Sequence, residues 1–283
     1  MADMGVYSRI IVGTDGSVTA RRAVRRAATI ARGLDTPLLV ATAYTRARPE
    51  DLGPRSERAG AHDLEASFGF GFIGAQETAQ DGAAIATSAA PGLQVDTATP
   101  HGEPADSLLE LTEANPGSLL VVGGQGLGAS GIFLLGNVPH KVSHHPVGDT
   151  LIVRTATERA DGAPDSVLIG TDGSKTATKA LDKGVAVAGA LGASVALVTV
   201  GRQQWAADVL AEAVDRVEAA GVTVTTEHHE GDPAAVLVER AADHGLLVLG
   251  NRGMTGARRF LMGSVPNKVS HHVAADLLIV KTT

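Results

Sequence analysis

Residues 136–153 read GNVPHKVSHHPVGDTLIV, and residues 263–280 read GSVPNKVSHHVAADLLIV. Each stretch follows a pair of glycines, and both fit the pattern G-x2-G-x9-G-[N/S]. The preceding pairs are Gly123 with Gly126 and Gly250 with Gly253. A glycine pattern that recurs at identical spacing, after an apolar run and before a helix-like segment, indicates one loop present in two copies.

The duplication extends to the amino-terminal part of each half. IIVGTDGS at 10–17 matches VLIGTDGS at 167–174, and LLVATAY at 38–44 matches VALVTVG at 195–201, both at an offset of 157 residues. The glycine loops match at an offset of only 127 residues. The first half therefore contains about thirty extra residues, most of them near 45–75, which read as a long polar loop followed by a Gly/Phe segment.

Short apolar runs alternate with amphipathic segments along the whole chain. Strands are predicted near 8–13, 38–43, 93–98, 118–123 and 150–154, and near 166–170, 195–200, 222–227, 246–250 and 277–281. Helices of the first half are predicted near 18–33, 75–89, 104–114 and 137–145. This alternation is typical of βαβ units. We therefore predict an α/β chain of two tandem, doubly wound, five-stranded parallel-sheet (Rossmann-like) domains, at 1–157 and 164–283, joined by the polar segment TATERADGAP at 155–164.

The composition excludes several classes of function. The formal net charge is −7 and aromatic residues make up 3% of the chain, which argues against a nucleic-acid-binding surface. No apolar stretch approaches the roughly 20 residues that cross a bilayer. Cysteine is absent, so no disulfide framework or thiolate metal site is expected. The amino-terminal sequence lacks the features of a signal peptide, and we expect a cytoplasmic protein.

A Thr-Asp-Gly-Ser sequence follows the first strand of each half, with the aspartates at positions 15 and 172. Ligands of such sheets lie beyond the carboxyl ends of the strands. Asp15 and Asp172 are therefore candidates to accept hydrogen bonds from a ribose hydroxyl or an adenine amino group. Two simpler interpretations remain: the serine caps the following helix, and the aspartate only shapes the turn.

The glycine loops are expected to bring backbone N–H groups close to a ligand, and a phosphate is the ligand that such groups suit best. Gly136-Asn137 and Gly263-Ser264 then open a helix, whose amino end carries a partial positive charge. The alternative is that the glycines serve only close packing of strand against helix.

With these motifs the chain resembles the universal stress protein family over nearly all of both halves. The resemblance implies that the aspartates, with Ala43 and Val200 on the second strands, contact adenine and ribose, and that the loop residues hold phosphates. The predicted cofactor-binding residues are Thr14, Asp15, Ala43, Gly123, Gly126, Gly136, Asn137 and Val138 in the first half, and Thr171, Asp172, Val200, Gly250, Arg252, Gly253, Gly263, Ser264 and Val265 in the second. The resemblance also implies that the two domains pair internally through their last strands.

The two loops differ in the residues between the glycines. The first loop, GGQGLGASGIFLLGN, has no Lys or Arg and carries Asn137 where the family usually has Ser or Thr. The second, GNRGMTGARRFLMGS, has Arg252, Arg258 and Arg259 and keeps Ser264. We therefore predict tighter polyphosphate binding in the second half. Both halves place proline, at 139 and 266, where a hydroxyl residue is common, which favours a ligand with fewer phosphates such as cyclic AMP.

Two charged clusters receive simpler interpretations. The KVSHH strings are predicted to form solvated, cationic helix ends, because adjacent histidines on a helix point about 100° apart and chelate one ion poorly. The quartet Arg21, Arg22, Arg25 and Arg26 is predicted to form the exposed face of the first helix.

The leading hypothesis is an adenine-nucleotide-binding stress-response protein that acts as a ligand-dependent regulator or sensor. ATP is the expected cofactor, with AMP and cyclic AMP as alternatives and Mg²⁺ as the ion that would accompany ATP. A slow ATPase and a ligand-free scaffold are the other classes. No metal-ligating or catalytic residues are predicted, and a homodimer of the tandem chain is a further alternative.

Overall fold

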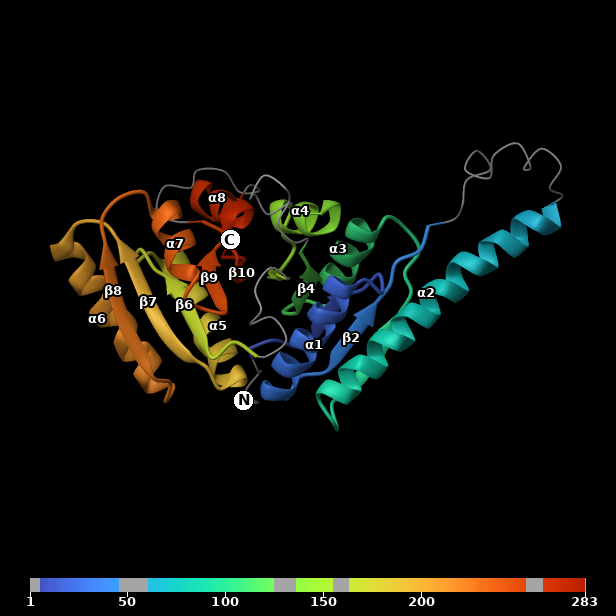
Figure 1. Ribbon diagram of the computed structural model, residues 1–283, viewed down its shortest axis with the longest axis horizontal. Coiled ribbons are helices and arrows are strands. Elements are labelled where there is room, and N and C mark those ends of the chain that lie inside the picture. The colour runs from blue at the N-terminus through green and yellow to red at the C-terminus, as the bar shows by residue number, and fades with distance from the viewer. Residues whose placement is uncertain (1–5, 46–60, 125–135, 155–162, 253–261, 283) are drawn as a thin grey trace.

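The computed structural model describes residues 6–45, 61–124, 136–154, 163–252 and 262–282, with residues 61–70 described for their backbone only. Figure 1 shows the two halves of the chain side by side. The first half contains β1 (Ile10–Gly13), α1 (Val18–Gly33), β2 (Leu38–Ala41), α2 (Ala61–Ala89), β3 (Val95–Ala98), α3 (Pro104–Ala114), β4 (Leu119–Gly123), α4 (Asn137–His144) and β5 (Asp149–Val153). The second half contains β6 (Ser166–Gly170), α5 (Lys175–Leu191), β7 (Ser194–Val200), α6 (Gln203–Ala219), β8 (Val224–His229), α7 (Pro233–Ala241), β9 (Leu246–Gly250), α8 (Ser264–His272) and β10 (Asp276–Val280).

Polar side chains set the amino ends of three helices. The hydroxyl of Ser17 accepts a hydrogen bond from the backbone N–H of Ala20, and that of Ser174 accepts one from Ala177, at 3.3 and 3.1 Å. These bonds satisfy amides that have no partner within the helix. Asp232 caps α7 in the same way. The predicted role of the serines as helix caps is confirmed.

The strands form one sheet in the order β3-β2-β1-β4-β5-β10-β9-β6-β7-β8. Pairing is parallel within each half, so the helices cross over and cover both faces. Helices α1, α2, α5 and α6 supply buried apolar residues on one face, and α3, α4, α7 and α8 supply them on the other. The prediction of two doubly wound α/β halves is confirmed.

The halves join through their last strands. β5 and β10 run antiparallel, with Leu151 opposite Leu278 and Ile152 opposite Leu277. The internal pairing that the resemblance implies is therefore present, and the hydrophobic core continues across it on both faces. The boundaries 1–157 and 164–283 stay a prediction, because residues 155–162 lie outside the described residues.

Two ion pairs cross this junction in a reciprocal way. Arg26 on α1 lies 2.9 Å from Asp276 on β10, and both side chains are buried. Lys183 on α5 lies 3.8 Å from Asp149 on β5. Lys183 is the counterpart of Arg26 at the repeat offset of 157 residues. In each half, a cationic side chain on the first helix thus pairs with an aspartate on the last strand of the other half.

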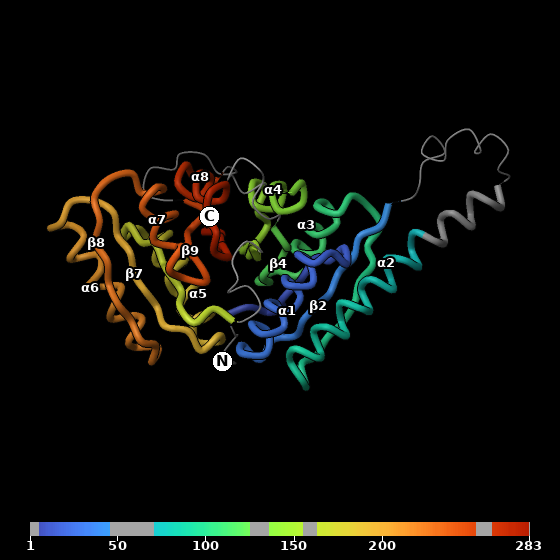
Figure 2. Tube along the Cα trace, in the orientation of Figure 1, coloured from blue at the N-terminus to red at the C-terminus, as the bar shows by residue number. Residues whose placement is uncertain are grey.

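The burial of Arg26 corrects the sequence interpretation of α1. Arg21 and Arg25 are exposed as predicted, but Arg22 is half-buried and Arg26 is buried, with 9% of the residue exposed. Helix α1 packs beside α5 of the second half at the centre of the molecule (Figure 2). Helix α1 therefore buries more than the single apolar stripe that its own sequence indicates.

The contact between α1 and α5 depends on Gly33. A Cβ atom at Gly33 would lie 2.2 Å from the carbonyl oxygen of Ala190. Ala190 is the counterpart of Gly33 at the repeat offset, so the two helices meet at equivalent positions.

Helix α2 begins at Ala61, well before the predicted start near 75. The Gly/Phe segment, which the sequence analysis places before the predicted helix, is therefore part of it. Glycine inside a helix costs only about 1 kcal/mol relative to alanine, and the flanking Ala, Leu, Glu and Gln residues are good helix formers. Proline, a stronger helix breaker, does not occur between Ala61 and Ala89. Across the described residues, no helix is both long and apolar enough to span a bilayer.

Candidate functional site

A pocket lies at the carboxyl ends of the strands in each half, where the fold predicts a ligand. The pocket of the first half has a volume of about 130 Å³ and that of the second about 390 Å³. Ligand-binding pockets usually measure about 300–1,000 Å³. The second pocket alone falls in this range.

Every described member of the predicted site in the second half lines the larger pocket. These residues are Thr171, Asp172, Val200, Gly250, Arg252, Gly263, Ser264 and Val265. The remaining member, Gly253, lies outside the described residues, as do Arg258 and Arg259. The residues therefore come together from the turn after β6, from β7 and β9, from the loop after β9 and from the start of α8.

The agreement is weaker in the first half. Thr14, Asp15, Ala43, Gly123 and Val138 line the smaller pocket. Gly136 and Asn137 open α4 beside Val138 but are not lining residues, and Gly126 lies outside the described residues. A Cβ atom at Gly123 would lie 2.9 Å from the backbone of Thr19, so close packing of β4 against α1 already requires glycine at this position.

The aspartates sit in matching turns. Asp15 accepts a hydrogen bond from the backbone N–H of Ser17 at 2.9 Å, and Asp172 accepts one from Ser174 at 3.1 Å. The Ser174 hydroxyl also donates to Asp172 at 2.5 Å. The glycine between aspartate and serine has a positive φ of 76° in the first half and 70° in the second. The turn role proposed for aspartate is therefore real, and it holds the carboxylate at the pocket.

A buried asparagine anchors the loop of the second half. The Asn251 side-chain oxygen accepts hydrogen bonds from the backbone N–H and the hydroxyl of Thr282, at 3.0 and 2.7 Å. The backbone of Asn251 also bonds to Val280 and Gly263, both at 2.8 Å. Asn251 is thereby tied to the end of β10, and Gly263, on the other side of the loop, is tied to Asn251. The first half has Gly124 at the equivalent position, and among the described residues its backbone N–H donates to Val153 on the last strand of that half, at 2.8 Å.

The larger pocket combines three kinds of lining. The Asp172 carboxylate is one, and Arg252 with the amino end of α8 is a second. Pro266 in the first turn removes one amide from this helix end. Apolar side chains complete the wall: Ala177, Val198, Val200, Trp205, Pro233, Leu237, Leu249 and Val265. The sequence pattern did not indicate Trp205, Pro233 or Leu237, because they come from α6 and α7, whose positions over the pocket depend on the tertiary fold.

The KVSHH histidines do not lie at either pocket. His145 and His272 are exposed as predicted, but His144 and His271 are half-buried. His144 lies across the junction from α8, with its Nε2 3.1 Å from the Asn267 side-chain oxygen. Among the described residues, no group of three His, Asp or Glu side chains is arranged to hold a metal ion.

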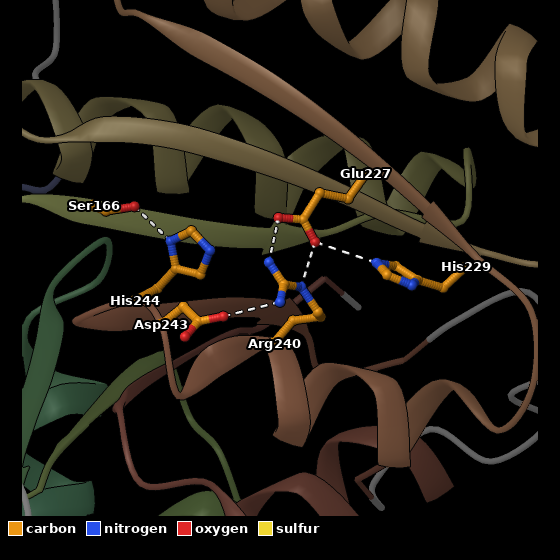
Figure 3. A network of polar contacts seen from close by, with 6 residues as sticks. All are labelled: Ser166, Glu227, His229, Arg240, Asp243 and His244. Carbon is orange, nitrogen blue, oxygen red and sulfur yellow. Dashed lines mark hydrogen bonds and ion pairs between the residues drawn. The ribbon is translucent and has the colours of Figure 1, made fainter.

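A network of charged side chains holds α7 against the edge strand β8 (Figure 3). Helix α7 carries Pro233 and Leu237 of the pocket wall. Two guanidinium nitrogens of Arg240 donate to the two carboxylate oxygens of Glu227, at 2.6 and 2.9 Å. Arg240 also donates to Asp243, and His229 lies 3.2 Å from Glu227. The Arg240 hydrogen bonds lower the pKa of Glu227 from its usual 4.5 to about 2. Paired donors of this kind fix the orientation of both side chains.

This pKa shift predicts a pH-dependent contribution to stability. Glu227→Gln should lower the free energy of unfolding by about 1–2 kcal/mol at pH 7. Because the folded-state pKa is depressed, the contribution is fully present above pH 4.5 and is lost as the pH falls towards 2. Urea unfolding of both proteins should show a constant difference above about pH 5 that shrinks in acid.

The matched control is Glu212→Gln on α6. Glu212 is 70% exposed and lies 3.9 Å from Arg216, so we expect a loss of only a few tenths of a kcal/mol. An equal loss in the two variants, or a difference for Glu227→Gln that does not change with pH, would contradict the assignment.

Comparison with known proteins agrees with the fold and the motifs. The profile of the Universal stress protein family matches residues 6–154 and 201–281. Universal stress protein Rv1636 of Mycobacterium tuberculosis is 37% identical over 155 residues, which are 54% of this chain and 99% of that protein. A universal stress protein solved in complex with cAMP is 36% identical, covers 43% of this chain and 100% of its own, and has a TM-score of 0.39.

The whole architecture also has a solved counterpart. A universal stress protein from Archaeoglobus fulgidus superposes with a TM-score of 0.76 and 18% identity, over 98% of this chain and 99% of its own. At this identity the likeness supports the fold alone. The profile match covers most of the sequence, and the chain belongs to the universal stress protein family.

Proposed function

We propose that this protein binds an adenine nucleotide in the pocket of its second half and acts in the cytoplasm as a ligand-dependent regulator of a stress response. The observation that carries the proposal is the difference between the pockets. The larger one, about 390 Å³, is lined by every described residue of the predicted site in that half. The smaller one, about 130 Å³, lies below the usual size of a ligand pocket.

The larger pocket matches the parts of a nucleotide. The Asp172 carboxylate accepts hydrogen bonds, which suits ribose hydroxyls or the adenine amino group. Arg252 and the first amides of α8, next to Ser264, suit a phosphate, because a helix amino end and a guanidinium both attract anions. The apolar wall suits the base. We also propose that the two domains span residues 1–157 and 164–283, and that the site residues have the roles given above.

ATP and cyclic AMP are the two ligands to separate. Arg252 and the loop anchored by Asn251 favour several phosphates, with Mg²⁺ accompanying ATP. Pro266 favours fewer, because it removes an amide and a hydroxyl from the helix end. Hydrolysis has less support: Asp172 is the only carboxylate among the described lining residues, so a separate general base is lacking there. We therefore propose binding without rapid turnover.

Calorimetric titration of the full chain tests the proposal. ATP with and without Mg²⁺, AMP and cyclic AMP should be titrated side by side, and we expect about one strong site per chain. Mass spectrometry of gently denatured protein would detect a nucleotide that copurifies. The absence of binding by all of these ligands up to millimolar concentration would reject the proposal and favour a ligand-free scaffold.

A further inference from the structure

The larger pocket contains one feature that the predicted site does not use. Trp205, in the first turn of α6, is half-buried and lines the pocket. It is the only aromatic residue among the described lining residues, and the only tryptophan in the chain. An aromatic side chain is thus part of an apolar wall that is otherwise aliphatic.

The backbone beneath the indole ring is fixed in place. A Cβ atom at Gly201 would lie 2.8 and 3.0 Å from two carbons of the six-membered ring, so the ring covers this glycine directly. The N–H of Gly201 donates to the carbonyl of His229 at 2.9 Å. The carbonyl of Gly201 lies 2.6 Å from Nε2 of His228. Both polar groups of Gly201 are therefore engaged, and the ring rests on a rigid support at the end of β7.

The first half is built differently at the equivalent place. Tyr44 stands where the second half has Gly201, at the repeat offset of 157 residues. Its ring packs edge-on against Phe72 and His101, with centroid distances of 5.4 and 5.3 Å. None of these three residues lines the smaller pocket, and its described lining contains no aromatic side chain. An aromatic wall is thus specific to the larger pocket.

We propose that Trp205 is the base-stacking residue of the second-half site and that this site selects ligands with a planar aromatic base. The inference rests on the proposed nucleotide function and names the part of the ligand that lies at α6. Stacking of a base on an aromatic side chain contributes about 1–3 kcal/mol, because both faces leave water and the two π-systems attract each other. The phosphates then extend towards Arg252 and α8.

Because Trp205 is the only tryptophan of the chain, the intrinsic tryptophan fluorescence of the wild-type protein reports on this pocket. Addition of ATP or cyclic AMP should change the emission of Trp205, with the same midpoint as the calorimetric titration. Trp205→Leu, which keeps an apolar side chain without a π-face, should weaken binding by about 5- to 100-fold. Trp205→Phe should restore most of the affinity. Gly201→Ala should also weaken binding, because its Cβ displaces the ring without removing it.

The matched control is Phe72→Leu, which removes an aromatic ring from the first half at a position outside either pocket and should leave affinity unchanged. Thermal unfolding of each variant identifies any that fail to fold.

The outcomes separate the two proposals. If nucleotides bind by calorimetry while tryptophan emission stays constant and Trp205→Leu binds as tightly as wild type, Trp205 is only a packing residue and this inference is wrong, although the proposed function stands. If no nucleotide binds to the wild-type protein, both fail. Matching midpoints, weakened binding by the leucine and alanine variants and rescue by phenylalanine support the assignment.

Discussion

Asp276→Asn should lower the free energy of unfolding by about 3–5 kcal/mol at pH 7, the largest effect on stability that we expect from one polar substitution in this chain. The side chain of Asp276 is 5% exposed, and that of its ion-pair partner Arg26 is 8% exposed. Burial raises the pKa of the Asp276 carboxyl, and Arg26 opposes that rise. Without the negative charge, the Arg26 guanidinium stays buried next to a neutral amide. Urea unfolding of the full chain measures the loss.

Asparagine is the informative replacement because its oxygen retains an acceptor for the backbone N–H of Arg154, which donates to Asp276 at 2.8 Å. The matched control is Asp149→Asn on the other side of the junction. The Asp149 side chain is 9% exposed, but its partner Lys183 is 3.8 Å away and 30% exposed, so the loss should be smaller, about 1–2 kcal/mol. Adding Arg26→Met to Asp276→Asn should recover much of the stability. Equal losses for the two aspartates would contradict the buried-pair explanation.

Asp172→Ala should weaken nucleotide binding by about 10- to 100-fold, since a hydrogen bond to a charged group contributes about 1.5–3 kcal/mol. Asp15→Ala should change the affinity less than two-fold, because the proposed site lies in the second half. Calorimetric titration with ATP and cyclic AMP measures both variants on the full chain.

The two substitutions form a close pair. Each aspartate accepts a hydrogen bond from the backbone N–H of the serine two residues later, and Asp172 accepts another from the Ser174 hydroxyl. Urea unfolding should therefore show a somewhat larger loss for Asp172→Ala with both variants folded, and a difference in affinity reports the ligand. Equal weakening by both variants would mean that the first pocket binds as well, and unchanged affinity for Asp172→Ala would remove this residue from the site.

Much of the fold follows from local sequence. The alternation of apolar runs and amphipathic segments, repeated at a fixed offset, predicts every strand near its observed position, and Ser17 and Ser174 mark the start of their helices. Arg26 shows where such reasoning ends. On an isolated helix its position is solvent-exposed, and only the pairing of β5 with β10 brings it to a carboxylate 250 residues later.

The candidate site divides in the same way. Residues that follow strand ends or open a helix, such as Asp172 and Ser264, are predictable because the sheet topology places all such positions at one edge. Trp205 is not, because its role depends on how α6 packs over β7 and on the absence of a side chain at Gly201. The different volumes of the two pockets also result from packing and have no local sequence signal.

The antiparallel union of β5 and β10 within one chain has a consequence for how the two pockets change. In a dimer of identical chains, every substitution alters both pockets at once. Here β5 and β10 belong to the same polypeptide, and the two halves have different sequences. A substitution in one half therefore changes the pocket of that half and leaves the other pocket unchanged. One half can therefore serve as a permanent partner that completes the sheet, with a pocket of about 130 Å³, while the other keeps about 390 Å³ and its own set of polar groups.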